Sequence, residues 1–310
     1  MPSVLAEYDG NKLQTRNFPG RLRGIAWDGR GSSLTLVGNG GEVTRIDGEK
    51  EVKFNTHTNH NLRAVSVNPN DDTALVVGNA GTIIAIGADG SLTKANSPTF
   101  ENLRAVRWND QGSMALIAGN NGVLIKYAEQ KLDVIDGGRA NLRGISWRRN
   151  SNNALITSNC FAEEFIPSPN LFAFNGTNNA LKPVSEGARM DLIGVDWNPS
   201  SELAIIVGYD VVWHNGYMAK FDGTNLSPIR FENERVYPIA VRWEPMGRVA
   251  AVATSITQLH SGQGRIILWN GETFKDIYRS EEFFFSQVAW APVGFKLAAI
   301  ASTEARTFDC

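Results

Sequence analysis

The sequence predicts an all-β fold in which seven four-stranded antiparallel units close into a ring. Three observations lead to this prediction. A short motif recurs seven times along the 310 residues, each copy is followed by a second apolar run and by turn signals, and the first residues of the chain match the half of a unit that is missing at its end. The prediction therefore rests on the pattern of the whole chain.

The repeated motif is six residues long and begins with Leu-Arg in its clearest copies. It reads Leu, Arg, a small residue, Val or Ile, a variable residue and Trp, and residues 103–108 show it in full. The seven copies end at residues 27, 67, 108, 147, 197, 243 and 290, which places them 39 to 50 residues apart. Repeats of this length are typical of solenoids and propellers, and units made of strands favour a propeller.

Each copy is predicted to be the first strand of its unit, followed by a polar turn and a second strand. The second strands are short runs rich in Ala, Val, Ile and Leu, at residues 34–37, 74–77, 115–118, 154–157, 203–207, 249–253 and 297–300. Such runs, bounded by Gly, Pro and Asn, are typical of strands buried on both faces. Third and fourth strands follow, with hairpins marked by Asp-Gly or Asn-Gly at residues 47–48, 89–90, 175–176, 222–223 and 270–271. Such pairs supply the positive φ that two-residue hairpin turns require, and no amphipathic helix is expected.

The last unit lacks its third and fourth strands, and residues 3–17 match that pattern. Pairing the two ends of the chain would remove the open sheet edges of an incomplete ring. We therefore predict a seven-bladed β-propeller, formed by residues 1–310 as one domain, with blades that start near residues 22, 62, 103, 142, 192, 238 and 285. The first strands would line the central channel. There, small residues at position three of the motif suit the crowded axis, and Val or Ile at position four and Trp at position six would pack between blades.

The units resemble β-propeller repeats, and residues 102–127 look most like the BNR-type propellers typified by photosystem II assembly factors. The architecture is also WD-repeat-like, but the Gly-His and Trp-Asp signatures of that family are absent. Residues 88–93 approach the sialidase Asp box and lack its Ser, its spacing and its Trp. The resemblance therefore implies an architecture and no glycosidase activity.

Composition narrows the classes of partner. The chain has 30 Lys and Arg against 32 Asp and Glu, a net charge of −2, so a bulk positive field that gathers nucleic acid or anionic lipid is not expected. Residues 1–10 show neither a basic start nor an apolar run, so we expect no signal peptide or membrane anchor and a cytoplasmic location. Cys160 and Cys310 are too few for a disulfide framework or a zinc site. The sequence leaves the oligomeric state open.

Four arginines at position two are the first candidate binding residues: Arg23, Arg63, Arg104 and Arg143. In a propeller they would converge at one mouth of the channel, where guanidinium groups suit a carboxylate, a phosphate or an acidic side chain. Alternatively, they bond backbone carbonyls or acids such as Glu101 and Asp191 of a neighbouring blade.

Three asparagines, Asn61, Asn102 and Asn141, precede three of these Leu-Arg pairs and are candidates for the same site. Gly-rich loops at residues 38–41, 78–81 and 119–122 are expected to face them. The amides of these loops would form either an anion nest or plain tight turns.

Insertions replace the tight loops in three blades, at residues 159–167, 209–217 and 255–264. They are predicted to emerge on the face of the arginines and to present candidate binding residues Phe161, Tyr209, Trp213 and His214. Exposed aromatic side chains in loops commonly anchor partners. The alternative is that these segments fold over and cover the channel mouth.

No catalytic motif is found in the sequence, and the histidines have no ligand spacing diagnostic of a metal. We therefore expect no catalytic residue, cofactor or metal. The favoured function is a non-catalytic scaffold that binds a protein partner, with the arginines receiving an acidic segment. The alternative is an enzyme or receptor for an anionic or sugar ligand, with Arg63, Arg104 and Arg143 as a clamp and Tyr209, Glu163 or Asp210 as candidate chemistry.

Overall fold

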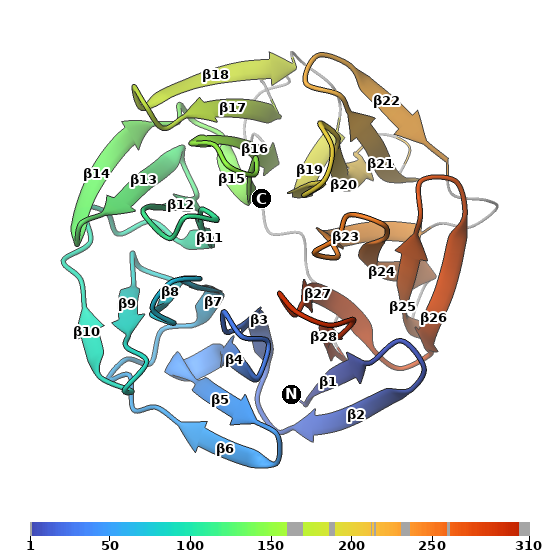
Figure 1. Ribbon diagram of the computed structural model, residues 1–310, viewed down its shortest axis with the longest axis horizontal. Coiled ribbons are helices and arrows are strands. Elements are labelled where there is room, and N and C mark those ends of the chain that lie inside the picture. Colours follow the sequence, from blue (N-terminus) through green and yellow to red (C-terminus); the bar gives the residue numbers. More distant parts are fainter. Residues whose placement is uncertain are drawn as a thin grey trace.

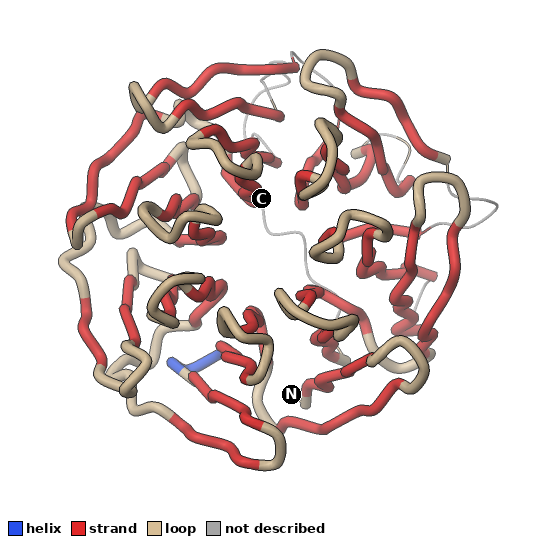
Figure 2. Tube along the Cα trace, in the orientation of Figure 1, coloured by secondary structure: helices blue, strands red, loops and turns tan. Residues whose placement is uncertain are grey.

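A computed structural model shows seven four-stranded antiparallel sheets arranged as blades around a central axis (Figure 1). It describes residues 2–159, 170–185, 190–211, 213, 215–230, 236–258 and 261–303. Strands make up most of the described chain, and its one helical segment is the 3-10 turn Asn39–Gly41 (Figure 2). The predicted all-β propeller is confirmed.

The blades follow one another in the order of the chain, each with its first strand nearest the axis. Blade 1 is β3 (Leu22–Trp27), β4 (Ser33–Gly38), β5 (Val43–Asp47) and β6 (Lys50–Lys53). Blade 2 is β7 (Leu62–Val67), β8 (Ala74–Gly78), β9 (Ile83–Ile86) and β10 (Leu92–Lys94). Blade 3 is β11 (Leu103–Trp108), β12 (Ala115–Gly119), β13 (Val123–Ala128) and β14 (Lys131–Asp136). Blade 4 is β15 (Asn141–Trp147), β16 (Asn153–Asn159), β17 (Leu171–Asn175) and β18 (Ala180–Ser185). Blade 5 is β19 (Met190–Trp197), β20 (Ala204–Asp210), β21 (Asn215–Phe221) and β22 (Leu226–Ile229). Blade 6 is β23 (Val236–Trp243), β24 (Ala250–Gln258), β25 (Ser261–Trp269) and β26 (Phe274–Ser280). Blade 7 is β27 (Phe284–Trp290), β28 (Leu297–Ser302), β1 (Ser3–Tyr8) and β2 (Leu13–Phe18).

Blade 7 closes the ring with strands from both ends of the chain, in the order β2-β1-β28-β27. Strand β1 runs antiparallel to β28, with Leu5 opposite Ile300 and Tyr8 opposite Leu297. Leu5 and Ile300 are fully buried. This pairing removes two sheet edges that would otherwise be open to other chains, and it confirms the predicted closure.

The core lies between neighbouring blades rather than within any one of them. One cluster, for example, joins Leu5 and Ile300 of blade 7 to Ile25 and Leu36 of blade 1. The crowding expected at position three is also present. A Cβ added to Gly24 would lie 2.8 Å from Cγ2 of Val37 and 3.0 Å from Cα of Ala64 in the next blade. Small residues at this position therefore let adjacent first strands approach each other.

Polar contacts also join consecutive first strands. In three blades the indole N–H of the position-six Trp donates to the carbonyl of position five in the preceding blade, from Trp27 to Ala289 (3.0 Å), from Trp147 to Arg107 (2.9 Å) and from Trp290 to Arg242 (3.0 Å). The side chain at position five in turn accepts the backbone N–H of position six in the next blade. These bonds join Trp108 to Ser66 (3.1 Å), Trp197 to Ser146 (2.9 Å) and Trp243 to Asp196 (2.8 Å). The tryptophans are therefore part of the framework of the ring.

Two of the predicted insertions are mainly longer strands rather than loops, which corrects the expectation for residues 209–217 and 255–264. In blade 5 the pairing continues to Asp210 opposite Asn215. In blade 6 it continues through Ser255 opposite Gly264 to Gln258 opposite Ser261. Continued hairpin pairing satisfies backbone groups that an irregular loop would leave to water.

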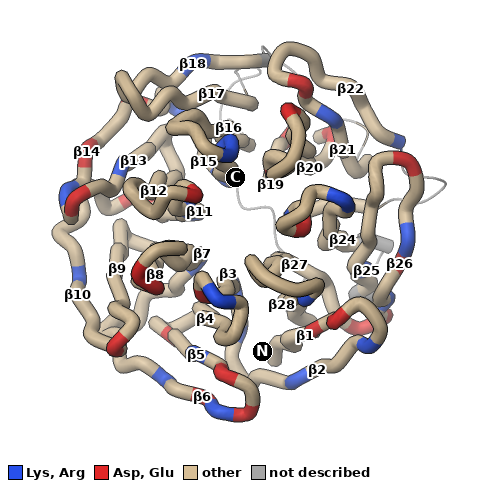
Figure 3. The backbone as a smooth tube through the Cα atoms, viewed as in Figure 1, with Lys and Arg blue, Asp and Glu red and all other residues tan. Residues whose placement is uncertain are grey.

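Acidic and basic positions are interspersed around the outer strands (Figure 3). No helix among the described residues is long and apolar enough to cross a membrane.

Candidate functional site: an arginine mouth and a charged channel

The first strands of all seven blades enclose a central cavity of about 560 Å³. Position-two residues line one end of the cavity, and the turns between first and second strands, including Asp110 and Arg149, line the other. We call the first end the arginine mouth, defined by Arg23, Arg63, Arg104 and Arg143. The structure therefore brings together the four arginines that the sequence spreads over 121 positions of the chain.

A β-bulge in each of the four first strands directs the arginine side chain. In each of these blades the register of the first and second strands shifts across position two, for example between Leu103 and Ala105. A bulge leaves the extra residue outside the ladder and re-aims its side chain. The arginine is that residue, so it turns from the sheet towards the cavity.

An asparagine sixteen residues further along the chain holds each of these arginines. The Nε of Arg104 donates to Oδ1 of Asn120 at 2.9 Å, and Nε of Arg63 donates to Oδ1 of Asn79 at 2.5 Å. The corresponding pairs in blades 1 and 4 are Arg23 with Asn39 and Arg143 with Asn159. Because an amide is neutral, this bond orients the guanidinium group without cancelling its charge. The sequence indicated backbone carbonyls or acids of a neighbouring blade as partners of these arginines, and the amide is a partner that it did not indicate.

The three candidate asparagines before the Leu-Arg pairs join neighbouring blades. Their side-chain oxygens accept backbone N–H groups from the Gly-rich loop of the preceding blade: Asn61 from Gly40 (3.1 Å), Asn102 from Ala80 (3.2 Å) and Asn141 from Asn121 (3.1 Å). These amides bond within the protein, as expected of tight turns rather than of an anion nest. Asn61, Asn102 and Asn141 therefore position the arginine mouth.

The aromatic candidates differ from one another. Tyr209 lies in β20, is 9% exposed, and donates its hydroxyl hydrogen to Oδ2 of Asp191 at 2.5 Å. Burial, and then this hydrogen bond, raise the pKa of Tyr209, so it is a buried donor and not a surface anchor. Trp213, in contrast, is 72% exposed. Phe161 and His214, together with Glu163, lie outside the described residues.

Phe100 is an exposed aromatic residue that the sequence reasoning missed, and it is 93% exposed. It lies between β10 and β11, next to Glu101, whose carbonyl accepts the N–H of Gly81. This places Phe100 at the end of the blades that carries the Gly-rich loops. Its neighbours are Thr99 and Glu101, so an isolated Phe in a polar segment was the only available signal.

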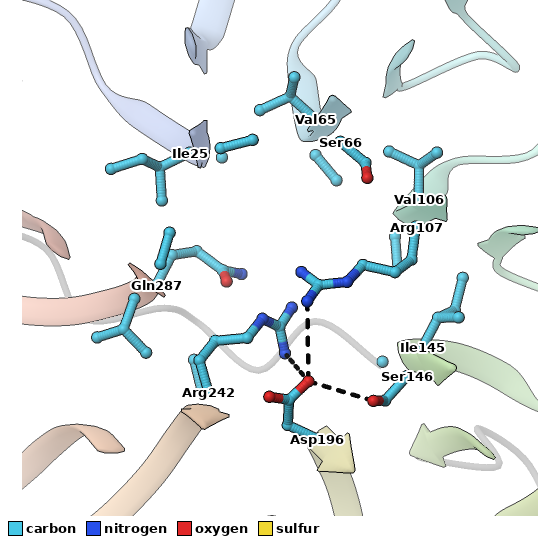
Figure 4. Close-up of a pocket in the computed structure, with 18 of the residues that line it drawn as sticks. Ile25, Val65, Ser66, Val106, Arg107, Ile145, Ser146, Asp196, Arg242 and Gln287 are labelled. Atoms are coloured by element: carbon cyan, nitrogen blue, oxygen red, sulfur yellow. Dashed lines mark hydrogen bonds and ion pairs between the residues drawn. The ribbon is translucent and has the colours of Figure 1, made fainter. Parts of the chain in front are cut away.

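A second group of charges lies in the middle of the channel and was also missed. Arg107, Asp196 and Arg242 occupy position five in blades 3, 5 and 6, and their side chains meet across the cavity (Figure 4). Nη2 of Arg107 lies 3.9 Å, and Nη1 of Arg242 3.8 Å, from Oδ1 of Asp196. Charged residues in the middle of an apolar strand motif were the available signal. Within the described chain, no three His, Cys, Asp or Glu residues are placed to hold a metal ion.

Ring closure, blade topology and the channel together define a seven-bladed β-propeller with an arginine-lined central cavity. The β-propeller domain of Cps50 (Swd1) from Myceliophteria thermophila has a similar fold, with a TM-score of 0.66 over 96% of this chain and 100% of that one. The two sequences are 12% identical, so this similarity concerns the fold alone. No protein-family model and no curated protein matches the sequence. The BNR-type resemblance is therefore unconfirmed.

Proposed function

We propose that the protein is a non-catalytic interaction scaffold that binds an acidic segment of a protein partner at the arginine mouth. The observation that carries this proposal is the set of four arginines from consecutive blades, each oriented towards the cavity by its own asparagine. Guanidinium groups held in place lose little freedom when they bind a carboxylate, which favours binding through preorganisation.

Exposed aromatic side chains support a protein partner over a small molecule for this surface. Phe100 and Trp213 lie in connections at the same end of the blades as the arginine mouth, and both are largely exposed. Aromatic and arginine side chains contribute most of the binding energy in many protein interfaces. A protein partner would use both the arginines and the aromatic side chains. Its acidic residues would contact the arginine mouth, and its apolar residues would contact Phe100 and Trp213.

The proposal is tested with a fluorescent oligopeptide of Asp and Glu and a matched oligopeptide of Asn and Gln, by fluorescence anisotropy. We expect the acidic peptide to bind, the amide peptide not to bind, and the affinity to fall as salt is added. Arg63→Glu combined with Arg104→Glu should weaken binding by a factor of about 100 or more, because a hydrogen bond to a charged group contributes about 1.5–3 kcal/mol.

The matched control is Arg30→Glu combined with Arg149→Glu, which makes the same change in charge at the other end of the blades. It should leave the peptide affinity within about twofold of wild type, because a six-residue first strand with a rise of about 3.3 Å per residue separates the two ends by roughly 20 Å, which exceeds a Debye length of about 8 Å. Equal binding of the acidic and amide peptides, or equal losses in the two double variants, would rule out the arginine mouth as the docking site. Affinity purification from the native source, with wild type and the two variants as bait, then identifies partners that depend on the mouth.

A further inference from the structure

The middle of the channel holds two arginines and one carboxylate that do not satisfy each other. Both Arg107 and Arg242 approach Oδ1 of Asp196, at 3.9 and 3.8 Å, which is too far for a hydrogen bond. The carboxylate instead accepts the hydroxyl of Ser146 at Oδ1 (3.2 Å) and the N–H of Trp243 at Oδ2 (2.8 Å). Asp196 is therefore bound mainly to the framework of the ring.

Arg242 is also bonded to the backbone, and Arg107 is partly open to the cavity. Nη1 of Arg242 donates to the carbonyls of Val195 (3.2 Å) and Val241 (2.9 Å). The Arg107 side chain is 40% exposed to the cavity, and its 3.9 Å approach to Asp196 is the only charge contact found for it within the described chain. Two positive charges thus share one negative charge at long range.

Arginines outnumber carboxylates among the described residues that line the cavity. These residues include three carboxylates, Asp28, Asp110 and Asp196, and eight arginines, Arg21, Arg23, Arg63, Arg104, Arg107, Arg143, Arg149 and Arg242. A narrow channel with low-dielectric walls focuses such a field. Burial, and then the charge of Arg107, lower the pKa of Arg242 to about 10, so the side chain remains a cation at neutral pH.

Neutral side chains complete the surroundings of the two guanidinium groups. Figure 4 shows the Gln287 amide pointing towards the same space, and Ser66 beside Arg107. Ile25, Val65, Val106 and Ile145 form an apolar part of the wall. The space therefore offers hydrogen-bond donors at its centre and hydrocarbon contacts at one side.

We propose that the middle of the channel is a binding site for a carboxylate, held between the guanidinium groups of Arg107 and Arg242 with its hydrocarbon part against Ile25, Val65 and Val106. A monoanion matches the excess charge of two arginines over one aspartate. Guanidinium forks suit the planar geometry of a carboxylate. The carboxylate belongs either to a free small aliphatic acid or to an acidic side chain that a partner inserts through the mouth. Only the second source rests on the proposed function.

Sodium propionate, with propionamide as the uncharged control, tests the site at constant ionic strength. Isothermal titration calorimetry and the melting temperature report binding. We expect saturable binding of propionate and none of propionamide. Arg107→Gln should weaken propionate binding at least about tenfold, because it removes one of the two guanidinium groups. Arg30→Gln, which removes a positive charge at an exposed position outside the cavity lining, should leave it unchanged within about twofold.

Asp196→Asn supplies a variant with the opposite expected sign. It keeps an oxygen that can accept the N–H of Trp243 and removes the competing negative charge. Propionate should therefore bind about tenfold more tightly or better than to wild type, whatever the change in protein stability. A purely structural role for the three residues would give no gain in affinity.

The oligopeptide of Asp and Glu provides the second arm. Propionate binding that depends on Arg107 assigns the site to a free acid. Peptide binding that depends on Arg107, without propionate binding, assigns it to a side chain of a partner. The proposal is overturned if neither probe binds, or if Arg107→Gln leaves the binding of both unchanged. Peptide binding lost only in the Arg63 and Arg104 variants, together with no propionate binding that depends on Arg107, would support the arginine mouth and still overturn the central site.

Discussion

Arg104 donates its Nε hydrogen to Oδ1 of Asn120 at 2.9 Å, from the first strand of blade 3 to the loop after the second. The same pair recurs in three other blades at the same separation of sixteen residues. Its recurrence gives the arginine mouth a regular geometry, because each of these four blades repeats the same bulge and the same amide.

Replacing the neutral amides by carboxylates should reduce the attraction of the mouth for acidic ligands. In Asn79→Asp combined with Asn120→Asp, the arginines keep their bonding partners and each acquires a negative charge beside it. We expect the acidic oligopeptide to bind at least about tenfold more weakly, with the melting temperature retained or raised. Anisotropy and thermal unfolding measure the two effects. Asn178→Asp, in an exposed outer hairpin, is the control, and an equal loss in that variant would contradict a local effect.

Removing the Asp196 side chain should destabilise the ring. Asp196→Ala takes away the acceptor of the Trp243 N–H and the only carboxylate close to Arg242 among the described residues. We expect the free energy of unfolding to fall by about 3 kcal/mol. Urea denaturation measures it. Asp133→Ala, which removes the 57% exposed partner of Lys126, should cost less than about 1 kcal/mol. Similar losses in the two variants would show that Asp196 makes no special contribution.

Weakening the closure of the ring should destabilise the whole propeller. Leu5 of β1 is fully buried and packs in the cluster between blades 7 and 1. Leu5→Ala should lower the free energy of unfolding by about 3 kcal/mol, from lost burial and the cavity that remains. Val52→Ala, at a 40% exposed position of β6, should change it by less than about 0.5 kcal/mol. If denaturant midpoints showed no loss for Leu5→Ala, the N-terminal strands would not secure the ring.

Tyr209 should make stability depend on pH in alkaline solution. Burial, followed by the hydrogen bond to Asp191, raises its pKa above the usual 10.0. The folded state therefore keeps the phenol proton of Tyr209 at pH values where the unfolded chain has lost it. The stabilisation that this proton provides is complete below pH 10. It is lost as the pH rises from there towards the folded-state pKa. Tyr209→Phe should reduce the slope of unfolding free energy against pH above pH 10 by up to about 1.4 kcal/mol per pH unit.

At neutral pH the same substitution should cost about 1.5–3 kcal/mol, because it removes a hydrogen bond to a charged group. Urea titrations of wild type and Tyr209→Phe at several pH values between 7 and 11 measure both quantities. Identical slopes for the two proteins would show that the hydroxyl does not hold its proton more tightly in the folded state.

The prediction of blades and ring closure succeeded because it needed only local signals and counting. Apolar runs such as residues 74–77, together with Asp-Gly and Asn-Gly pairs, specify strands and turns through short-range preferences. Residues 3–17 supply the two strands that the end of the chain lacks. The insertion at residues 209–217 was misjudged because whether a hairpin continues depends on its backbone pairing, which aromatic residues in the sequence do not reveal.

The sequence by itself determined the seven stranded units, the closure of the ring and the presence of arginines in four consecutive units. Only the tertiary structure decided what those arginines contact, because a bulge in each first strand turns them towards an asparagine and the cavity. It alone also placed Arg107, Asp196 and Arg242 together. These residues lie in three separate units, and they become neighbours because the closed ring brings every first strand to one axis.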